Sequence, residues 1–227
     1  MTPAFDLALA ERIQACGIVA VLIIDREEDA VPVARALLAG GVNVMELTLR
    51  TPAALGALKR IKAEVPEMLA GVGTILTTEQ VKQTVEAGAA FGVAPGVNPR
   101  VLNAAREAGL SFGPGVATPT DIELALEHGC KLLKFFPAKP MGGLTYLKAA
   151  AAPYLHLGVK FVPLGGVNAK NMSVYLADPL IAALGGSWLA PKDAIQTAGW
   201  PTITKLAAEA IGTIKAARAA STTKSAP

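Results

Sequence analysis

Two ionisable side chains in this sequence stand within apolar runs, where their charge needs an explanation. One is Lys134, in the run LLKFFP at residues 132–137. Burying an unpaired ammonium is costly, and desolvation disfavours its charged form, so such a lysine tends to lose its proton. A neutral amine is the nucleophile that forms a Schiff base with a ketone. The alternative is a lysine at a strand end whose ammonium reaches solvent.

The other residue is Glu46, in the run VMELTLR at residues 44–50. Side chains alternate between the two faces of a strand, which places Val44, Glu46, Thr48 and Arg50 on one face. If Val44 faces the interior, Glu46 does so too. A buried carboxylate near a reactive lysine can serve as general base or acid. The alternative is a structural ion pair between Glu46 and Arg50.

Two further side chains follow predicted strands. Arg50 stands just past the second apolar run, where a guanidinium can hold a carboxylate through two parallel hydrogen bonds. Thr74 follows Gly-Val-Gly at residues 71–73, and these small residues let a substrate approach its hydroxyl. An ordinary turn residue is the alternative at Thr74.

Two glycine pairs indicate a site for a phosphate. They lie at Gly165-Gly166 and at Gly185-Gly186, the second followed by Ser187. Exposed backbone N–H groups bind anions, and glycine is favoured because a Cβ would block the approach. We therefore expect the backbone N–H groups of Gly165, Gly166 and Gly186 to hold a phosphate group.

Composition excludes several other classes of function. The two histidines have no Asp, Glu or His at ligand spacing and the two cysteines form no CxxC, so neither a metal nor a cofactor is expected. The net charge of +3 comes without a basic cluster outside predicted helix faces, which disfavours nucleic acid and is compatible with a small anion. No signal peptide or membrane-length apolar run is present, and a cytoplasmic location is the expectation.

The elements that position these residues alternate regularly. After an opening helix at about residues 6–16, apolar runs and helical patterns alternate in eight βα units. The runs are at residues 18–24, 42–49, 68–72, 91–94, 111–114, 131–136, 159–163 and 181–184; the helices are at residues 27–39, 53–65, 78–87, 99–108, 119–128, 144–154, 169–177 and 201–218. Such alternation predicts parallel strands with right-handed crossovers.

Eight such units in 227 residues favour a single α/β domain, a (β/α)₈ TIM barrel preceded by a helix. The barrel is expected over residues 1–215, and the tail at residues 216–227, rich in Ala, Ser, Thr and Lys, is expected to be frayed. No GxGxxG follows the first run, which disfavours a dinucleotide-binding sheet. In a barrel the active site lies at the carboxyl ends of the strands.

Several segments together resemble the 2-keto-3-deoxy-6-phosphogluconate aldolases, which often also act as 4-hydroxy-2-oxoglutarate aldolases. The likeness covers nearly the whole chain except the tail. The matching segments are GV at 41–42, ELTLRT at 46–51, GVGT at 71–74, VAPG at 93–96, PGVAT at 114–118, KFFPA at 134–138, GGV at 165–167 and GGSWL at 185–189.

The resemblance implies a role for each candidate. Lys134 would form the imine with the substrate's C2 carbonyl, and Glu46 would move protons. Arg50 and Thr74 would hold the pyruvate carboxylate, while the glycine loops and Ser187 would hold the 6-phosphate. The family is metal-independent and usually trimeric, so the expected partners are a phosphorylated keto acid, pyruvate and two further copies of the chain.

One position departs from the family pattern. Leu164 precedes the first glycine pair, where the family usually has Thr near the part of the substrate that becomes the aldehyde. The related enzyme for the galactonate epimer has an apolar residue there, so preference at C4 is open. The alternatives are therefore an aldolase for the 6-phosphogalactonate epimer or with relaxed C4 specificity, a non-catalytic barrel that binds a phosphorylated ligand, and a phosphate-binding isomerase or synthase.

Overall fold

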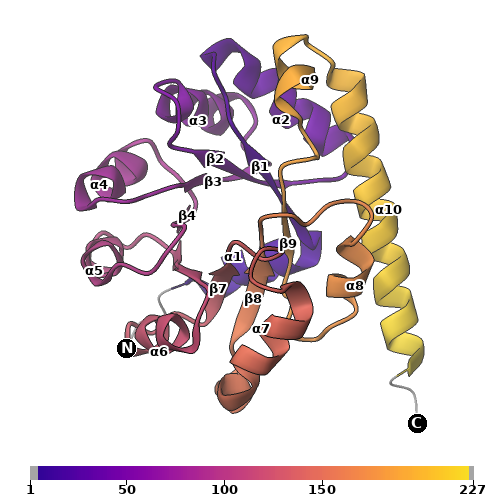
Figure 1. The fold of residues 1–227 in the computed structure, drawn as a ribbon. Helices are drawn as coiled ribbons and strands as arrows, with labels where there is room; N and C mark the ends of the chain where they lie inside the picture. The colour runs from indigo at the N-terminus through magenta and orange to yellow at the C-terminus, as the bar shows by residue number, and fades with distance from the viewer. Residues whose placement is uncertain (1–4, 225–227) are drawn as a thin grey trace.

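The structure, a computed structural model, describes residues 5–224 of the chain. Parallel strands curl around a common centre and helices surround them, which is an α/β architecture (Figure 1). The strands are β1 (Ile18–Leu22), β2 (Val44–Thr48), β3 (Leu69–Gly73), β4 (Gly92–Val93), β5 (Phe112–Gly113), β6 (Gly115–Val116), β7 (Leu132–Phe135), β8 (Lys160–Pro163) and β9 (Leu184–Gly186).

The described strands form two sheets in which every pair is parallel. The first has the order β5-β4-β3-β2-β1-β9 and the second β6-β7-β8. Only Pro114 separates β5 from β6 along the chain. Between β8 and β9, Phe161 of β8 forms a parallel bridge with Ile181, and the N–H of Ala182 donates to the carbonyl of Phe161 at 2.9 Å.

The helices that follow the strands form the outer layer. They are α2 (Ala30–Ala39), α3 (Ala54–Glu64), α4 (Thr78–Glu86), α5 (Pro99–Glu107), α6 (Pro119–Glu127), α7 (Gly143–Ala151), α8 (Met172–Leu176), α9 (Lys192–Gln196) and α10 (Trp200–Lys224), with 3₁₀ turns at Glu27–Asp29 and Ala152–Leu157. Because helices cover one face and the interior of the curled sheets lies on the other, β1, β2 and β3 are buried along their whole length.

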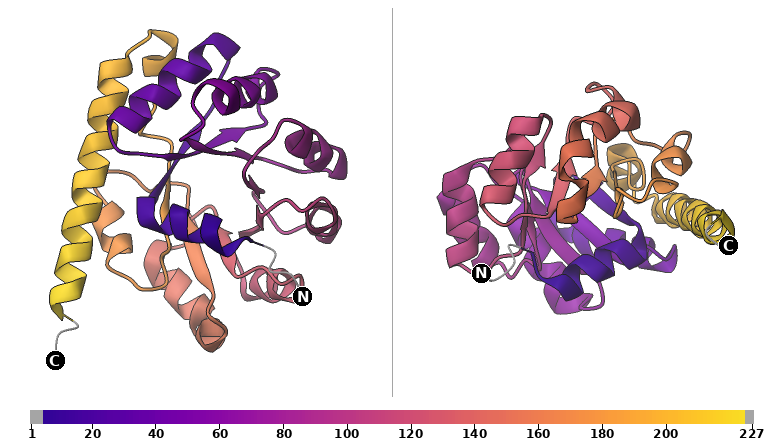
Figure 2. Two further views of the ribbon diagram at one scale, coloured as in Figure 1. Left: turned by 180° about the vertical axis from the view of Figure 1, so that it is seen from behind. Right: turned by 90° about the horizontal axis from the view of Figure 1, so that it is seen from below.

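One helix covers the end of the curled sheets where the strands begin. Helix α1 (Leu7–Cys16) starts at the Asp6 cap, ends at Gly17 and crosses beneath the strands (Figure 2). Phe5 and Ile13 are buried there against the interior. The opposite end, where the strands finish and the βα loops begin, is therefore the end at which a small molecule can enter.

The expected alternation is confirmed, and the main differences concern β9, α9 and α10. Strand β9 begins at Leu184 and not at Ile181, because residues 181–182 only bridge β8. Helix α9 was not expected, and α10 continues to Lys224, past Arg218, where the last helix was expected to end; fraying of the tail from Ala216 stays a prediction. Arg218 donates to the carbonyls of Ala15, at 2.7 Å, and Gln14, which fixes α10 against the end of α1.

The remaining part of the expected tail, residues 225–227, lies outside the described residues. Across the range that the structure covers, no helix combines the length and apolar character needed to cross a membrane.

Candidate active site

Lys134 and Glu46 meet in the interior around which the strands curl. Lys134 Nζ lies 3.1 Å from Glu46 Oε1 and 3.5 Å from Oε2, and the two residues are only 8% and 3% exposed. They come from β7 and β2, which are not neighbours in either sheet, so the contact spans the interior. The arrangement brings an amine and a carboxylate within proton-transfer distance in a place largely closed to water.

The position of the Glu46 carboxylate depends on a neighbouring glycine. Glu46 is paired with Gly71 in the register between β2 and β3, and Gly73 ends β3 two residues later. A Cβ at Gly73 would overlap Glu46 Oε1. Gly73 therefore leaves the space through which Glu46 reaches Lys134.

The structure rules out the Glu46–Arg50 ion pair as the resting arrangement. Within the described residues, Glu46 pairs with Lys134, and exposed Arg50 donates through Nε to Thr48 Oγ1 at 3.2 Å. The Thr48 hydroxyl in turn donates to the carbonyl of Leu22 on β1 at 3.0 Å. These bonds hold the Arg50 side chain at the carboxyl end of β2, on the side where the strands finish.

Thr74 stands at the end of the neighbouring strand β3 in an unusual backbone conformation. Its φ is 62°, in the left-handed region, and its side chain is partly buried. A β-branched residue rarely adopts this conformation, which costs about 1–3 kcal/mol. Because β2 and β3 are paired, Arg50 and Thr74 lie at adjacent positions on the same rim.

The ion pair borders a small cavity in the interior between the strands. The cavity has a volume of about 30 Å³ and is lined by Glu46, Lys134 and mainly apolar side chains, among them Phe91, Val162 and Leu164. This is room for a water molecule beside the two groups. Leu164 therefore faces the same space as Lys134, and a Cβ at Gly185 would overlap its Cδ1.

The first glycine pair forms a loop with free backbone donors. Gly165 and Gly166 have φ values of 96° and 84°, which favour glycine, and Gly166 is exposed. Within the described range, neither N–H donates a hydrogen bond to the protein. The second pair ends β9, where Trp188 covers Gly186 and Ser187 is exposed. Both loops lie at the rim where β8 and β9 finish.

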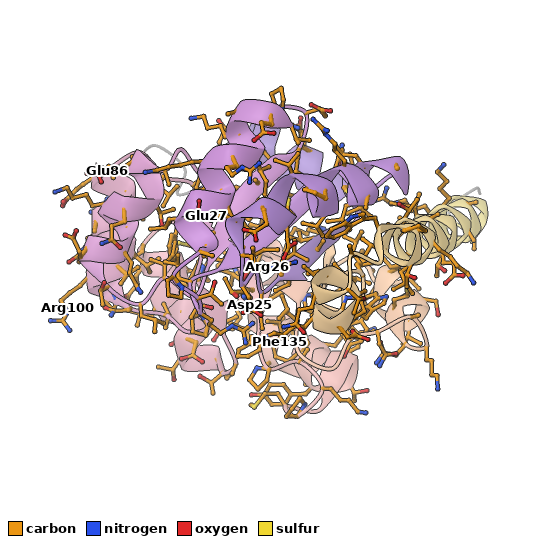
Figure 3. All side chains as sticks on the ribbon, turned by 90° about the horizontal axis from the view of Figure 1, so that it is seen from above. Asp25, Arg26, Glu27, Glu86, Arg100 and Phe135 are labelled. Carbon is orange, nitrogen blue, oxygen red and sulfur yellow. The ribbon has the colours of Figure 1, made fainter. Side chains whose placement is uncertain are left out.

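Sequence reasoning missed a contact that fixes the loop after β9. Asp25 accepts a hydrogen bond from Gln196 Nε2 at 3.1 Å and pairs with Lys192 Nζ at 2.9 Å, which ties α9 to the loop after β1. The hydrogen bond from Lys192 is the main cause that lowers the pKa of Asp25. Figure 3 shows Asp25 in this central region, whereas Glu86 and Arg100 lie on outer helices. The signal in the sequence was an acidic residue directly after the first apolar run.

Neither cysteine lines the cavity beside Lys134 and Glu46. Cys16 and Cys130 are free and buried, and burial raises the pKa of the Cys130 thiol to about 12. Between Phe5 and Lys224, no group of three or more His, Cys, Asp or Glu side chains is arranged to hold a metal ion.

Comparisons with known proteins point to one family. Residues 9–206 match the family described as KDPG and KHG aldolase, where the abbreviations denote 2-keto-3-deoxy-6-phosphogluconate and 4-hydroxy-2-oxoglutarate. The KHG/KDPG aldolase of Escherichia coli (strain K12) is 43% identical over 203 residues, which cover 89% of this chain and 94% of that protein.

Two solved structures of similar proteins carry small molecules. The KDPG aldolase of Legionella pneumophila, with pyruvate captured at low pH as a covalent carbinolamine intermediate, is 40% identical with a TM-score of 0.83, covering 88% of this chain and 96% of that one. The 2-keto-3-deoxy-6-phosphogluconate aldolase of Zymomonas mobilis ZM4 with 3-phosphoglycerate is 38% identical with a TM-score of 0.81, covering 90% and 96%.

Proposed function

The chain belongs to the KDPG and KHG aldolase family, and from that premise we propose that it cleaves 2-keto-3-deoxy-6-phosphogluconate to pyruvate and glyceraldehyde 3-phosphate through a Schiff base on Lys134. It is a lyase that breaks a carbon–carbon bond. The observation that carries the proposal is the buried contact of 3.1 Å between Lys134 Nζ and Glu46 Oε1. Binding alone does not require a buried amine and a carboxylate at this distance.

The proposal includes a closed (β/α)₈ barrel as the scaffold. In this arrangement β5 and β6 form one strand interrupted at Pro114, and the bridge between β8 and the chain entering β9 closes the ring. The contact between β2 and β7 across the interior supports this interpretation. Active sites of such barrels lie at the carboxyl ends of the strands, where Arg50, Thr74 and the glycine loops are found.

The reaction begins when Glu46 takes the proton of the Lys134 ammonium, and the neutral amine then attacks C2 of the substrate. Glu46 returns protons as the carbinolamine forms and loses water, directly or through a water in the adjoining cavity. The product of this stage is a protonated imine at C2. Its positive charge makes it an acceptor for the electrons of the bond that will break.

Cleavage then follows from removal of the proton of the C4 hydroxyl by Glu46. The C3–C4 bond breaks, C4 becomes the aldehyde carbon and the electron pair moves to the imine nitrogen, which gives a neutral enamine in place of an unstabilised carbanion. Protonation at C3 and hydrolysis release pyruvate and regenerate Lys134. The acid–base steps contribute about 10²–10⁴-fold to such reactions.

The rim residues bind the two ends of the substrate. Arg50 and Thr74 hold the carboxylate, for which the exposed guanidinium at the end of β2 is suited. The N–H groups of Gly165, Gly166 and Gly186, with Ser187, hold the 6-phosphate. The unused donors of Gly165 and Gly166 support this assignment.

Borohydride trapping tests the Schiff base directly. The protein is incubated with pyruvate and reduced, and the modified peptide is mapped by mass spectrometry. We expect the mass of reduced pyruvate on Lys134 and none on Lys131, an exposed lysine three residues away. Both Lys134→Ala and Lys134→Arg should abolish trapping and turnover. Absence of labelling in the parent protein would favour a non-catalytic barrel, an isomerase or a synthase.

A second activity and a second epimer deserve assay. Cleavage of 4-hydroxy-2-oxoglutarate to pyruvate and glyoxylate uses the same imine. The apolar Leu164 in the cavity beside Lys134 favours the alternative of relaxed C4 specificity or preference for the 6-phosphogalactonate epimer. Pyruvate release from both C4 epimers distinguishes these possibilities.

The assembly and location expected from the resemblance complete the proposal. We propose a homotrimer in the cytoplasm. Light scattering coupled to size-exclusion chromatography tests the trimer, and cell fractionation tests the location.

A further inference from the structure

We infer that Lys139 supplies a positive charge to the phosphate end of the site and makes the enzyme selective for phosphorylated over phosphate-free substrates. The inference deepens the proposed function and rests on it. It concerns a residue in the loop between β7 and α7, five positions after Lys134, that belongs to neither the imine chemistry nor the glycine loop.

The first observation is the close contact of this loop with the first glycine pair. The N–H of Ala138 donates to the carbonyl of Leu164, and the N–H of Lys139 donates to that of Gly165, both at 2.8 Å. The loops that follow β7 and β8 therefore run side by side (Figure 1). These two bonds fix the base of the Lys139 side chain relative to the glycine pair.

The second observation is the course of the Lys139 stem. A Cβ at Gly166 would lie 2.5 Å from Lys139 Cβ and 3.0 Å from its Cδ, so the methylene chain lies across Gly166. The ammonium is two bonds beyond Cδ and is therefore within reach of the glycine loop. Lys139 is exposed, and its ammonium forms no ion pair or hydrogen bond with any of the described residues.

The third observation is the charge of the surrounding chain. Residues 128–177 contain six lysines and no Asp, Glu or Arg. Within this stretch Lys134, Lys148 and Lys160 have partners in Glu46, Asp178 and the carbonyl of Pro179. No carboxylate in the stretch competes for Lys139. A phosphate monoester carries about −1.5 to −2 charges near pH 7, and a lysine acts on it as a point charge.

The test compares two substrates that differ only in the phosphate, 2-keto-3-deoxy-6-phosphogluconate and 2-keto-3-deoxygluconate. Lys139→Met removes the charge and keeps most of the stem, and Lys139→Arg keeps the charge. We expect Lys139→Met to lower kcat/KM for the phosphorylated substrate about fivefold through KM, the upper range for an exposed pair of charges. The loss for the phosphate-free substrate should be under twofold, and Lys139→Arg should restore most of the preference.

Lys131→Met is the matched control, since Lys131 is an exposed lysine at the opposite end of β7. It removes the same net charge and should leave the ratio of the two kcat/KM values unchanged. Raising the ionic strength should reduce the effect of Lys139→Met. The Debye length, beyond which exposed charges are largely screened, falls from about 10 Å at 0.1 M salt to about 3 Å at 1 M.

Three results would overturn the inference: no change in the ratio for Lys139→Met, an equal loss for both substrates, or the same shift in Lys131→Met. Trapping of pyruvate on Lys134 with borohydride separates this failure from failure of the proposed function. A parent protein that traps pyruvate while Lys139→Met keeps the parental ratio refutes only the role of Lys139.

Discussion

Replacing Glu46 with Gln separates a catalytic role of this carboxylate from a structural one. The amide keeps the shape of the side chain and removes the base 3.1 Å from Lys134 Nζ. Loss of a general base in this position should lower kcat by about 10² or more, which corresponds to about 2.7 kcal/mol in the barrier. The substitution also affects stability, because it removes one partner of a buried ion pair.

The stability effect can be estimated separately. Both partners are more than nine-tenths buried, and removing one member of such a pair costs about 3–5 kcal/mol. At about 2–4 °C per kcal/mol for a domain of this size, Tm should fall by about 6–20 °C. Glu46→Gln should therefore remain folded at 25 °C, and kcat can be measured on the folded protein.

The assay follows pyruvate release at 25 °C with a lactate dehydrogenase couple, alongside thermal unfolding by circular dichroism. Glu86→Gln is the control, because it makes the same chemical change on the outer helix α4, where Glu86 is exposed and lies 4.0 Å from Lys82. It should change neither kcat nor Tm appreciably. A Glu46→Gln protein with a lowered Tm and the parental kcat would refute the catalytic role and leave Glu46 as a structural partner of Lys134.

Four further predictions follow from the site. Gly73→Ala should lower kcat by about 10-fold or more, because the added Cβ displaces the Glu46 carboxylate. The control is Gly212→Ala, where a Cβ meets no atom within 4 Å; it should leave kcat unchanged and raise the free energy of unfolding by up to about 1 kcal/mol. Equal kcat values in the two variants would contradict the prediction. Leu164→Thr should raise the ratio of kcat/KM for the gluconate epimer to kcat/KM for the galactonate epimer several-fold, which is the scale of about 1 kcal/mol for one neutral hydrogen bond. If the parent protein already prefers one epimer by about 10⁴ and Leu164→Thr leaves this preference unchanged, other residues determine the stereochemistry. Excess EDTA should leave pyruvate release unchanged because the imine itself accepts the electrons, and a loss restored by zinc or magnesium would indicate a metal-dependent aldolase. Iodoacetamide at pH 8 should not label Cys130 in the folded protein, because the Cys130 thiol is buried and has a pKa of about 12, but it should label Cys130 after unfolding. Rapid labelling of the native protein would show that the region around Cys130 opens.

The sequence was sufficient to predict the alternation of strands and helices and the two ionisable residues of the interior. Period-2 alternation correctly placed Glu46 on the inner face of its strand. It could not establish that Glu46 meets Lys134, because the two are 88 positions apart and their strands are not neighbours in a sheet. Local spacing favoured Arg50 as the partner, but that side chain bonds to Thr48 on the rim.

The elements that were misplaced have weak local signals. Strand β9 is Leu184–Gly186, and two glycines give no pattern of apolar side chains from which a strand is recognised. Helix α9 spans only five residues, too few for a repeat of apolar residues at helical spacing to be recognised. The extension of α10 depends on Arg218 reaching the carbonyls at the end of α1, a contact between segments about 200 residues apart that no local composition indicates.

The energetic cost of the site argues that its features are retained for chemistry. A buried ion pair is often no more stabilising than apolar residues of the same volume, so the contact between Lys134 and Glu46 is poorly explained by stability. Thr74 adds a left-handed φ of 62° that costs about 1–3 kcal/mol, although glycine would adopt it freely. Both costs fall on the interior and carboxyl-end rim of the strands. Elsewhere in the described residues, Ala198 has a left-handed φ of 53° and the buried Thr84 hydroxyl has no hydrogen-bond partner, but these two features are isolated. An imine-forming site requires an amine kept from water and a rim that holds the substrate in a fixed position. The buried pair of Lys134 and Glu46 and the left-handed Thr74 supply these two features at one end of the fold.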